Sequence, residues 1–155
     1  MQLNEQKKEI TNKEWEHWKQ VIVKVFNQYG QTQYDQRFLD EIWHVSTKVL
    51  PGLEVSVIVD GNNKLYISKG TGVFVDYTDE NVAGMRIPIK CWIHTHPFGQ
   101  AYFSGTDWRT INTQRPILME AIVLGDKQSM RWENNQSEGD MLYRTEAICL
   151  DIEEE

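Results

Sequence analysis

Two of the chain's four histidines stand one residue apart within CWIHTHPFGQAYFSGTDW, residues 91–108. Side chains alternate along a strand, so His94 and His96 should share a face, where their imidazoles could converge on one ion. Pro97 cannot continue a strand's hydrogen bonds, which frees the chain to loop back and return the carboxylate of Asp107. Two imidazoles and one carboxylate make three protein ligands. For zinc, this leaves a fourth position for water, as in catalytic rather than closed structural sites.

An H-x-H pattern alone is weak evidence for a metal site, because short motifs recur by chance. In the alternative interpretation, His94 and His96 are merely polar residues at the end of a strand, and Asp107 is merely a residue at the start of a helix. Three other chemistries fit worse. The metallo-β-lactamase pattern needs an Asp-His pair where this chain has Pro97-Phe98-Gly99. An amidohydrolase barrel needs about 250 residues. A thiol mechanism fails because Cys91 and His94, three apart on a strand, face opposite sides, so Cys91 is better explained as a small buried hydrophobe.

Written as H-T-H-P, six residues, then S-x-x-D, the stretch resembles the motif of the JAMM (MPN+) zinc metalloproteases. The signature spans residues 94–107, and the resemblance in fold covers roughly residues 35–150. It implies an α/β (α+β) fold with a curved mixed sheet flanked by helices, related to that of cytidine deaminases, here with an extra N-terminal helix. It also implies that Zn²⁺ is bound by His94, His96 and Asp107, and that Ser104 stabilises the oxyanion.

The resemblance further implies a glutamate that acts as general base at the start of an upstream strand. Glu54 fits this role, because it begins the apolar run EVSVIV, 40 residues before His94. Alternation places Glu54, Ser56 and Ile58 on the less apolar face of that strand. We therefore expect Glu54 to take a proton from the attacking water and to deliver it to the leaving amine.

The match around Glu54 departs from the family pattern in two respects. Pro51 precedes the glutamate by three residues rather than two, and Val57 stands where a glycine is usual. Because most glutamates are solvated, an ordinary surface charge is the alternative interpretation. The chain offers three poorer candidates for the base: Glu41, Glu80 and Glu120.

Hydrophobic periodicity predicts the elements that must position these residues. A helix is expected over 11–30, with a Thr11–Glu14 capping box and one apolar stripe made of Trp15, Trp18, Ile22, Val25, Phe26 and Tyr29. A second helix is expected over 35–50, and a short third one near 104–114, capped by Ser104 or Thr106. A hairpin is expected over 54–68, and further extended segments over 71–77, 85–96, 119–125, 129–134 and 145–152. Residues 1–10 are expected to be flexible, and 11–155 to form a single domain.

Composition narrows the class of protein. A net charge of −7 and dispersed basic residues argue against a nucleic-acid binder. No apolar run approaches the roughly 18 residues of a membrane span, and the N-terminus lacks the apolar core of a secretory signal. Two cysteines are too few for a disulfide framework, which favours a cytoplasmic protein.

The resemblance implies a zinc isopeptidase or peptidase that cuts after the C-terminal tail of a ubiquitin-like protein or its conjugate. Two alternatives are a processing peptidase for a sulfur-carrier or phage polypeptide tail, and a non-catalytic MPN-type scaffold. We expect an extended tail to add along a strand edge near residues 71–89, with the 76–85 loop as an adjustable lid. The N-terminal helix could present Trp15 and Trp18 to a partner or to a second subunit.

Overall fold

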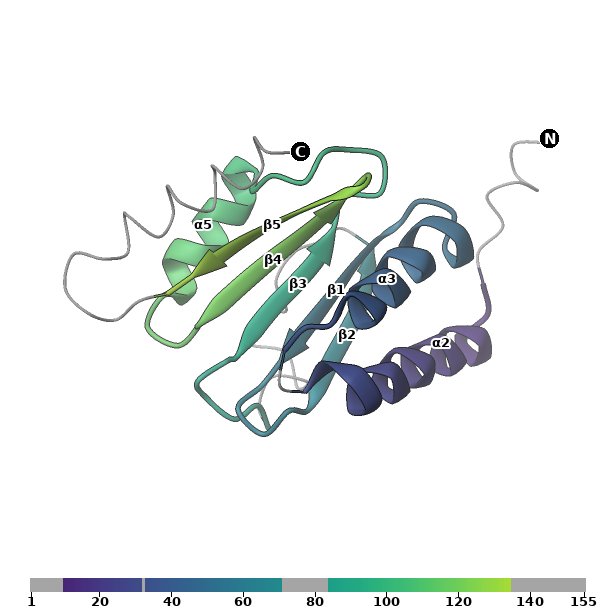
Figure 1. The fold of residues 1–155 in the computed structure, drawn as a ribbon, viewed down its shortest axis with the longest axis horizontal. Helices are drawn as coiled ribbons and strands as arrows, with labels where there is room; N and C mark the ends of the chain where they lie inside the picture. The colour runs from purple at the N-terminus through teal and green to yellow at the C-terminus, as the bar shows by residue number, and fades with distance from the viewer. Residues whose placement is uncertain (1–9, 32, 71–83, 135–155) are drawn as a thin grey trace. The chain divides into compact units, whose positions relative to one another are not determined.

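The computed structural model describes residues 10–31, 33–70 and 84–134, which form two compact units within Met1–Leu53 and Glu54–Glu155. The first unit is helical, and the second holds a five-stranded mixed sheet and one helix (Figure 1). The expected mixed α/β class is therefore confirmed. The strands predicted over 71–77 and 145–152, and residues 1–9, lie outside the described residues. No described helix has the length and apolar character needed to cross a membrane.

The first unit consists of two helices that each end in a π-helical turn. α2 (Asn12–Val25) continues into η1 (Phe26–Gly30), and α3 (Gln36–His44) continues into η2 (Val45–Val49). The predicted capping box is present: the Glu14 N–H donates to Thr11 Oγ1 at 3.0 Å, and the Thr11 N–H donates to the Glu14 carboxylate at 2.8 Å. Both helices therefore begin at predicted positions, since Asp35 caps α3 by accepting the Arg37 N–H.

Aromatic rings join the two helices. The centroids of Phe26 and Phe38 lie 5.1 Å apart, and Trp18 contacts His44 edge-on at 5.8 Å. The predicted apolar stripe was wrong at Tyr29, which is 41% exposed and stacks under the Arg37 guanidinium. The π-helical turn explains this difference, because it adds a residue to one turn and rotates the following side chains off the stripe.

The sheet of the second unit has the order β2-β1-β3-β4-β5. Its strands are β1 (Glu54–Val59), β2 (Leu65–Gly70), β3 (Cys91–Thr95), β4 (Glu120–Gly125) and β5 (Gln128–Glu133). All neighbouring pairs are antiparallel except β3 and β4, which are parallel. A parallel pair needs a crossover, and α5 (Gly105–Gln114) supplies it on one face of the sheet (Figure 1).

The hairpin prediction is confirmed by the β1–β2 pair, whose loop is held by the Asp60 carboxylate as it accepts the N–H groups of Asn62 and Lys64. The extended segment predicted over 85–96 was too long, because only Cys91–Thr95 forms a strand. Pro88 lacks the N–H that a ladder needs, and Ile89 makes only an isolated bridge to Leu118.

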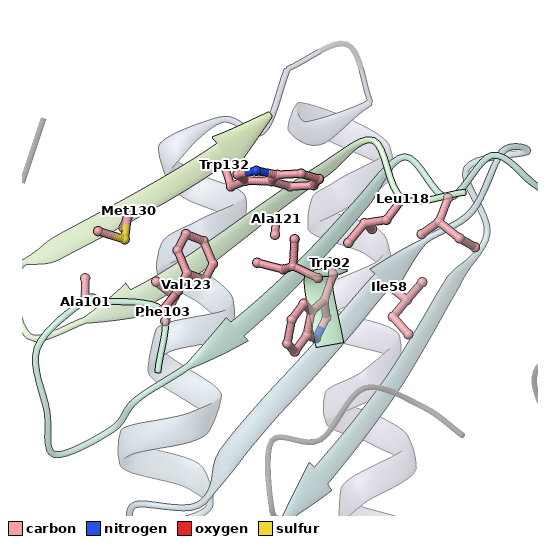
Figure 2. Close-up of a cluster of buried hydrophobic side chains, with 11 residues drawn as sticks. Ile58, Trp92, Ala101, Phe103, Leu118, Ala121, Val123, Met130 and Trp132 are labelled. Carbon is pink, nitrogen blue, oxygen red and sulfur yellow. The ribbon is translucent and has the colours of Figure 1, made fainter. Parts of the chain in front are cut away.

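A hydrophobic core lies on the α5 face of the sheet (Figure 2). Its largest side chains are the indoles of Trp92 on β3 and Trp132 on β5, both fully buried. The other members come from β1, from the segment before β3, from both segments flanking α5, from α5 itself and from β4 and β5: Ile58, Ile89, Ala101, Phe103, Ile111, Leu118, Ala121, Val123 and Met130. Because side chains alternate, this face continues from Ile58 to Ser56 and Glu54 on β1, and from Trp92 to His94 on β3.

Glu120 lies on the opposite face, since its neighbour Ala121 belongs to this core, as does Val123 two residues further along β4. Burial raises the pKa of Glu120 to about 7, against the effect of the Arg131 guanidinium and with the help of Glu133, its cross-strand partner. The Arg131 Nε lies 2.8 Å from the Glu120 carboxylate, but Arg131 is itself half exposed, so burial outweighs the ion pair. This placement separates Glu120 from the two histidines.

We predict that Glu120 makes the stability of the fold depend on pH. Its folded pKa lies above the ordinary glutamate value of 4.5, so the folded state holds the proton more tightly than the unfolded chain does. The free energy of unfolding should therefore fall as pH rises from about 4.5 to about 7, by about 1–3 kcal/mol relative to Glu120→Gln. Urea denaturation of both proteins across this range measures it, and a pH-independent difference would show that Glu120 stays ionised beside Arg131.

Candidate metal centre

Two histidines and one aspartate meet at the carboxyl end of β3. His94 lies on the strand, His96 directly follows it, and Asp107 lies in the first turn of α5. Their ligand atoms are within 4.8 Å of one another. The Nε2 atoms of His94 and His96 lie 3.0 Å and 3.3 Å from the same oxygen, Oδ2 of Asp107. The structure thus brings together the three residues that the sequence pattern singled out as ligands.

These separations suit a small divalent ion. Two ligands that each lie about 2.0–2.1 Å from a tetrahedral ion are about 3.3 Å apart. The distances from the Asp107 oxygen to the two imidazole nitrogens are close to this value. The three side chains could therefore hold a metal ion after small adjustments, and the donor set of two nitrogens and one oxygen is one that zinc accepts.

The start of α5 aims the Asp107 carboxylate. Ser104 is the N-cap, and the Asp107 N–H donates to its Oγ at 3.1 Å. In return, the Ser104 N–H donates to Asp107 Oδ2 at 2.9 Å, which completes a capping box. Of the two caps that the sequence allowed, Ser104 is therefore the one used, and Thr106 is not. The oxygen that faces the imidazoles is the same oxygen that closes the helix cap.

A tight turn orients His96. The His96 N–H donates to the Leu124 carbonyl at 2.8 Å, and the Gly99 N–H donates back to the His96 carbonyl at 3.0 Å. The Nδ1 atom of His96 lies 3.2 Å from the Gln100 carbonyl oxygen. Since a carbonyl can only accept, Nδ1 carries the proton in this contact, and the lone pair of Nε2 is left for the site.

Gly125, the last residue of β4, allows this turn to lie against the sheet. A Cβ at position 125 would come 2.6 Å from the carbonyl carbon of Gln100 and 2.9 Å from the Cα of Ala101. Backbone atoms cannot move aside as a flexible side chain can. Only glycine therefore permits the close approach that carries the Gln100 carbonyl to His96.

His94 is completely buried, and its ring stacks on the indole of Trp92 with centroids 4.3 Å apart and planes 12° apart. Neither of its ring nitrogens makes a hydrogen bond to a described residue. Asp107 Oδ2 is near enough to Nε2, at 3.0 Å, but the alignment is not that of a hydrogen bond. A buried polar atom without a partner costs about 1–3 kcal/mol, so this nitrogen fits a site that an ion completes.

The pKa of each of these three residues is affected by one or both of the others. Burial alone would raise the pKa of Asp107, but the two imidazoles and the Ser104 N–H outweigh it and hold this pKa well below the usual range. Burial lowers the pKa of His94, which favours its neutral form. The contact with Asp107 raises the pKa of His96. An ionised carboxylate and a neutral buried imidazole are the forms that bind a cation.

Glu54 lies beside this group. The antiparallel ladder of β1 and β3 ends at the pair Ser56–His94, and Glu54 stands two residues before Ser56 on the same face of β1. The Val55 N–H donates to the Thr95 hydroxyl at 2.9 Å. Burial raises the pKa of Glu54, His96 opposes this effect and Asp107 adds to it. The charges of His96 and Asp107 thus both affect the pKa of the half-buried Glu54 carboxyl.

Of the three alternative bases, only Glu120 belongs to the described part of the second unit, and it does not share this position. Glu120 faces the other side of the sheet, Glu41 lies on α3 in the first unit, and Glu80 lies outside the described residues. Among the candidates, Glu54 is the residue that the fold of the second unit brings to the metal ligands.

Four aromatic residues surround the motif. Phe103 is buried and contacts Trp108, with centroids 5.2 Å apart, while Trp92 stacks on His94. The Tyr102 ring meets His96 edge-on at 5.2 Å and is 50% exposed. The sequence pattern did not indicate that Tyr102 contacts His96. It also could not have found the Gln100 carbonyl, because a backbone contact leaves no residue signature.

No protein-family model matches the chain, and neither a curated protein nor a solved structure is significantly similar to it. A metal centre is therefore supported by the side chains themselves. It depends on three ligand atoms at coordinating separations, on the buried His94 nitrogens without hydrogen bonds, and on the helix cap that aims Asp107.

We predict that His96→Ala and Asp107→Asn each weaken the affinity for Zn²⁺ at least about 100-fold, because each removes one of three ligands. The wild type should bind one ion per chain. Elemental analysis of purified protein and competition with a chromophoric chelator measure stoichiometry and affinity.

The matched control is His44→Ala, which removes an exposed histidine on α3. It should bind zinc as the wild type does. If His96→Ala kept wild-type affinity, or if His44→Ala lost as much, the ion would be held elsewhere.

Proposed function

We propose that this protein is a zinc-dependent hydrolase of peptide or isopeptide bonds, similar to the JAMM metalloproteases. One observation carries the proposal: Glu54, at the start of β1 and two residues before the Ser56–His94 pair, is close enough to His96 and Asp107 for their charges to act on its pKa. A metal centre with a half-buried carboxyl beside it has the parts of a hydrolytic site, whereas a structural ion needs no such neighbour. We also propose that the sheet and α5 are a JAMM-type fold.

When bound, zinc would polarise a carbonyl group and lower the pKa of a water molecule. The carboxylate of Glu54 then takes a proton from the attacking water and delivers it to the nitrogen of the departing amine. The raised pKa of Glu54 suits this double task, because a group that must both accept and return a proton works best near the pH of the reaction.

Ser104 can stabilise the developing oxyanion while it caps α5. Its Oγ accepts the Asp107 N–H, and a hydroxyl group still has its own proton to donate. That proton is available for the substrate's carbonyl oxygen. One residue thus holds a metal ligand in place and supplies a hydrogen bond during the reaction.

A polypeptide substrate agrees with the residues at the surface of the site. His94 is buried beneath Trp92, whereas His96 is partly exposed beside Tyr102, so a substrate approaches from the His96 side. Phe98, 87% exposed in the same turn, offers a further apolar contact. Exposed aromatic rings beside a metal suit the side chains of a peptide.

The resemblance supports a ubiquitin-like tail, or its conjugate to lysine, as the substrate. Processing of a short carrier-protein tail uses the same chemistry, and the two differ only in the leaving amine. The docking edge expected near residues 71–89 lies mostly outside the described residues. A scaffold without activity would keep the fold and would not need Glu54 beside the ligands.

We predict that Glu54→Gln lowers kcat for cleavage by about 10²–10⁴-fold while zinc affinity stays close to that of the wild type, because the amide cannot accept the proton. The assay uses zinc-loaded protein and a panel of ubiquitin-like proteins that carry either a C-terminal extension or a lysine conjugate. Mass spectrometry identifies the bond that is cut.

Glu120→Gln is the control, because this carboxyl lies on the opposite face of the sheet. Chelation should abolish cleavage, and added zinc should restore it. An active Glu54→Gln protein would contradict the mechanism. A zinc-loaded wild type that cuts no member of the panel would favour the scaffold.

We predict that Ser104→Ala lowers kcat by about 10²–10³-fold, because it removes the hydroxyl donor to the oxyanion. It also removes a helix cap, which costs about 1 kcal/mol of stability. Thr11→Ala is matched to it, since Thr11 caps α2 in the same type of capping box. It should lose similar stability and keep its activity. Equal losses of activity in the two variants would show that Ser104 acts only as a cap.

A further inference from the structure

The two histidines of the metal centre are held in different ways. A metal-bound histidine usually donates its second ring N–H to an oxygen, which fixes the tautomer and the orientation of the ring. His96 follows this rule through the Gln100 carbonyl. His94 does not, because neither of its nitrogens has a hydrogen-bond partner among the described residues. Something else must fix the plane of this buried ring.

The indole of Trp92 stacks on the imidazole ring of His94. Trp92 and His94 are two residues apart on β3 and share a face, and their rings are nearly parallel, with planes 12° apart and centroids 4.3 Å apart. A ring stacked this closely cannot turn about its Cβ–Cγ bond without losing the contact. The stack therefore holds the plane of the ring in which Nε2, the ligand atom of His94, lies.

Trp92 is itself held by a hydrogen bond. Its Nε1–H donates to the Oγ of Ser56 at 2.9 Å, and both residues are buried. Ser56 is the cross-strand partner of His94, while Trp92 pairs with Ile58. The bond thus runs diagonally across the β1–β3 ladder and inclines the indole toward the histidine. Without it, an indole can adopt other rotamers in the core.

We propose that Trp92, anchored by Ser56, is the positioning residue of His94 and takes the place of the missing hydrogen bond. The inference rests on the metal centre of the proposed function, and does not require that any bond be hydrolysed. It assigns a role in metal binding to two residues that touch no ion. Loss of either should loosen the His94 ring and weaken the site.

The test is a titration of the metal-free protein with Co²⁺ alone, read by the visible absorption of the bound ion. Trp92→Leu removes the stack and should weaken Co²⁺ binding by about 10–100-fold, the usual effect of losing such a support. Ser56→Ala and Trp92→Phe each break the hydrogen bond and should give smaller losses with shifted absorption bands. Because they break the same bond, the double variant should bind no more weakly than the weaker single variant.

The matched control is Trp132→Leu, which removes a second fully buried tryptophan of the same core, two strands away on β5. It should lose stability in urea as Trp92→Leu does, and yet keep the Co²⁺ affinity and spectrum of the wild type. This comparison separates a role in positioning from a role in packing.

The outcomes are distinct. If Ser56→Ala, which removes one oxygen atom, bound Co²⁺ with wild-type affinity and spectrum, the inference would be overturned even if Trp92→Leu failed to fold. Equal loss of affinity in Trp132→Leu would overturn it too, as would a wild type that bound no Co²⁺. A wild type that bound Co²⁺ through this network and hydrolysed nothing would leave the inference standing and refute only the hydrolase.

Discussion

The carboxylate of Asp107 is the point on which the site depends, because a single oxygen serves two structures at once. Oδ2 accepts the N–H of Ser104, which starts α5, and faces the ring nitrogens of both His94 and His96. The helix cap therefore determines where the ligand lies. The S-x-x-D spacing is that of a capping box, so the pattern that positions the carboxylate is local and does not depend on a metal.

The rest of the site depends on contacts between strands. The β1–β3 register sets Ser56 beside His94, and Glu54, two residues earlier on β1, is near enough to His96 and Asp107 for their charges to act on it. The parallel β3–β4 pair requires the crossover that contains Asp107. The core beneath α5 fixes both pairings. The buried His94 imidazole, which makes no hydrogen bond to a described residue, is tolerated there because the surrounding apolar contacts stabilise the fold.

The sequence alone predicted the parts of this arrangement that are local. Alternation placed His94 and His96 on one face, and helix-cap chemistry gave Thr11 and offered Ser104. It could not predict features that arise from distant segments or from the backbone. The Gln100 carbonyl at His96, the stack of Trp92 on His94 and the distance of Glu54 from the ligands all require the folded sheet. The π-helical turn at Phe26–Gly30 displaced Tyr29 from its expected face. The periodicity of apolar residues assumes a regular α-helix and therefore could not predict this turn.

The close approach of Gly125 to Gln100 and Ala101 has a consequence for how such a site can diversify. The turn after His96 is pinned to the end of β4 at its far side, so residues cannot be added to it or removed from it without moving a ligand. Within this turn, the exposed side chains of Phe98, Gln100 and Tyr102 can vary without changing its length. A preference for a different substrate would therefore arise by substitution of single residues in this turn and not by lengthening of the turn.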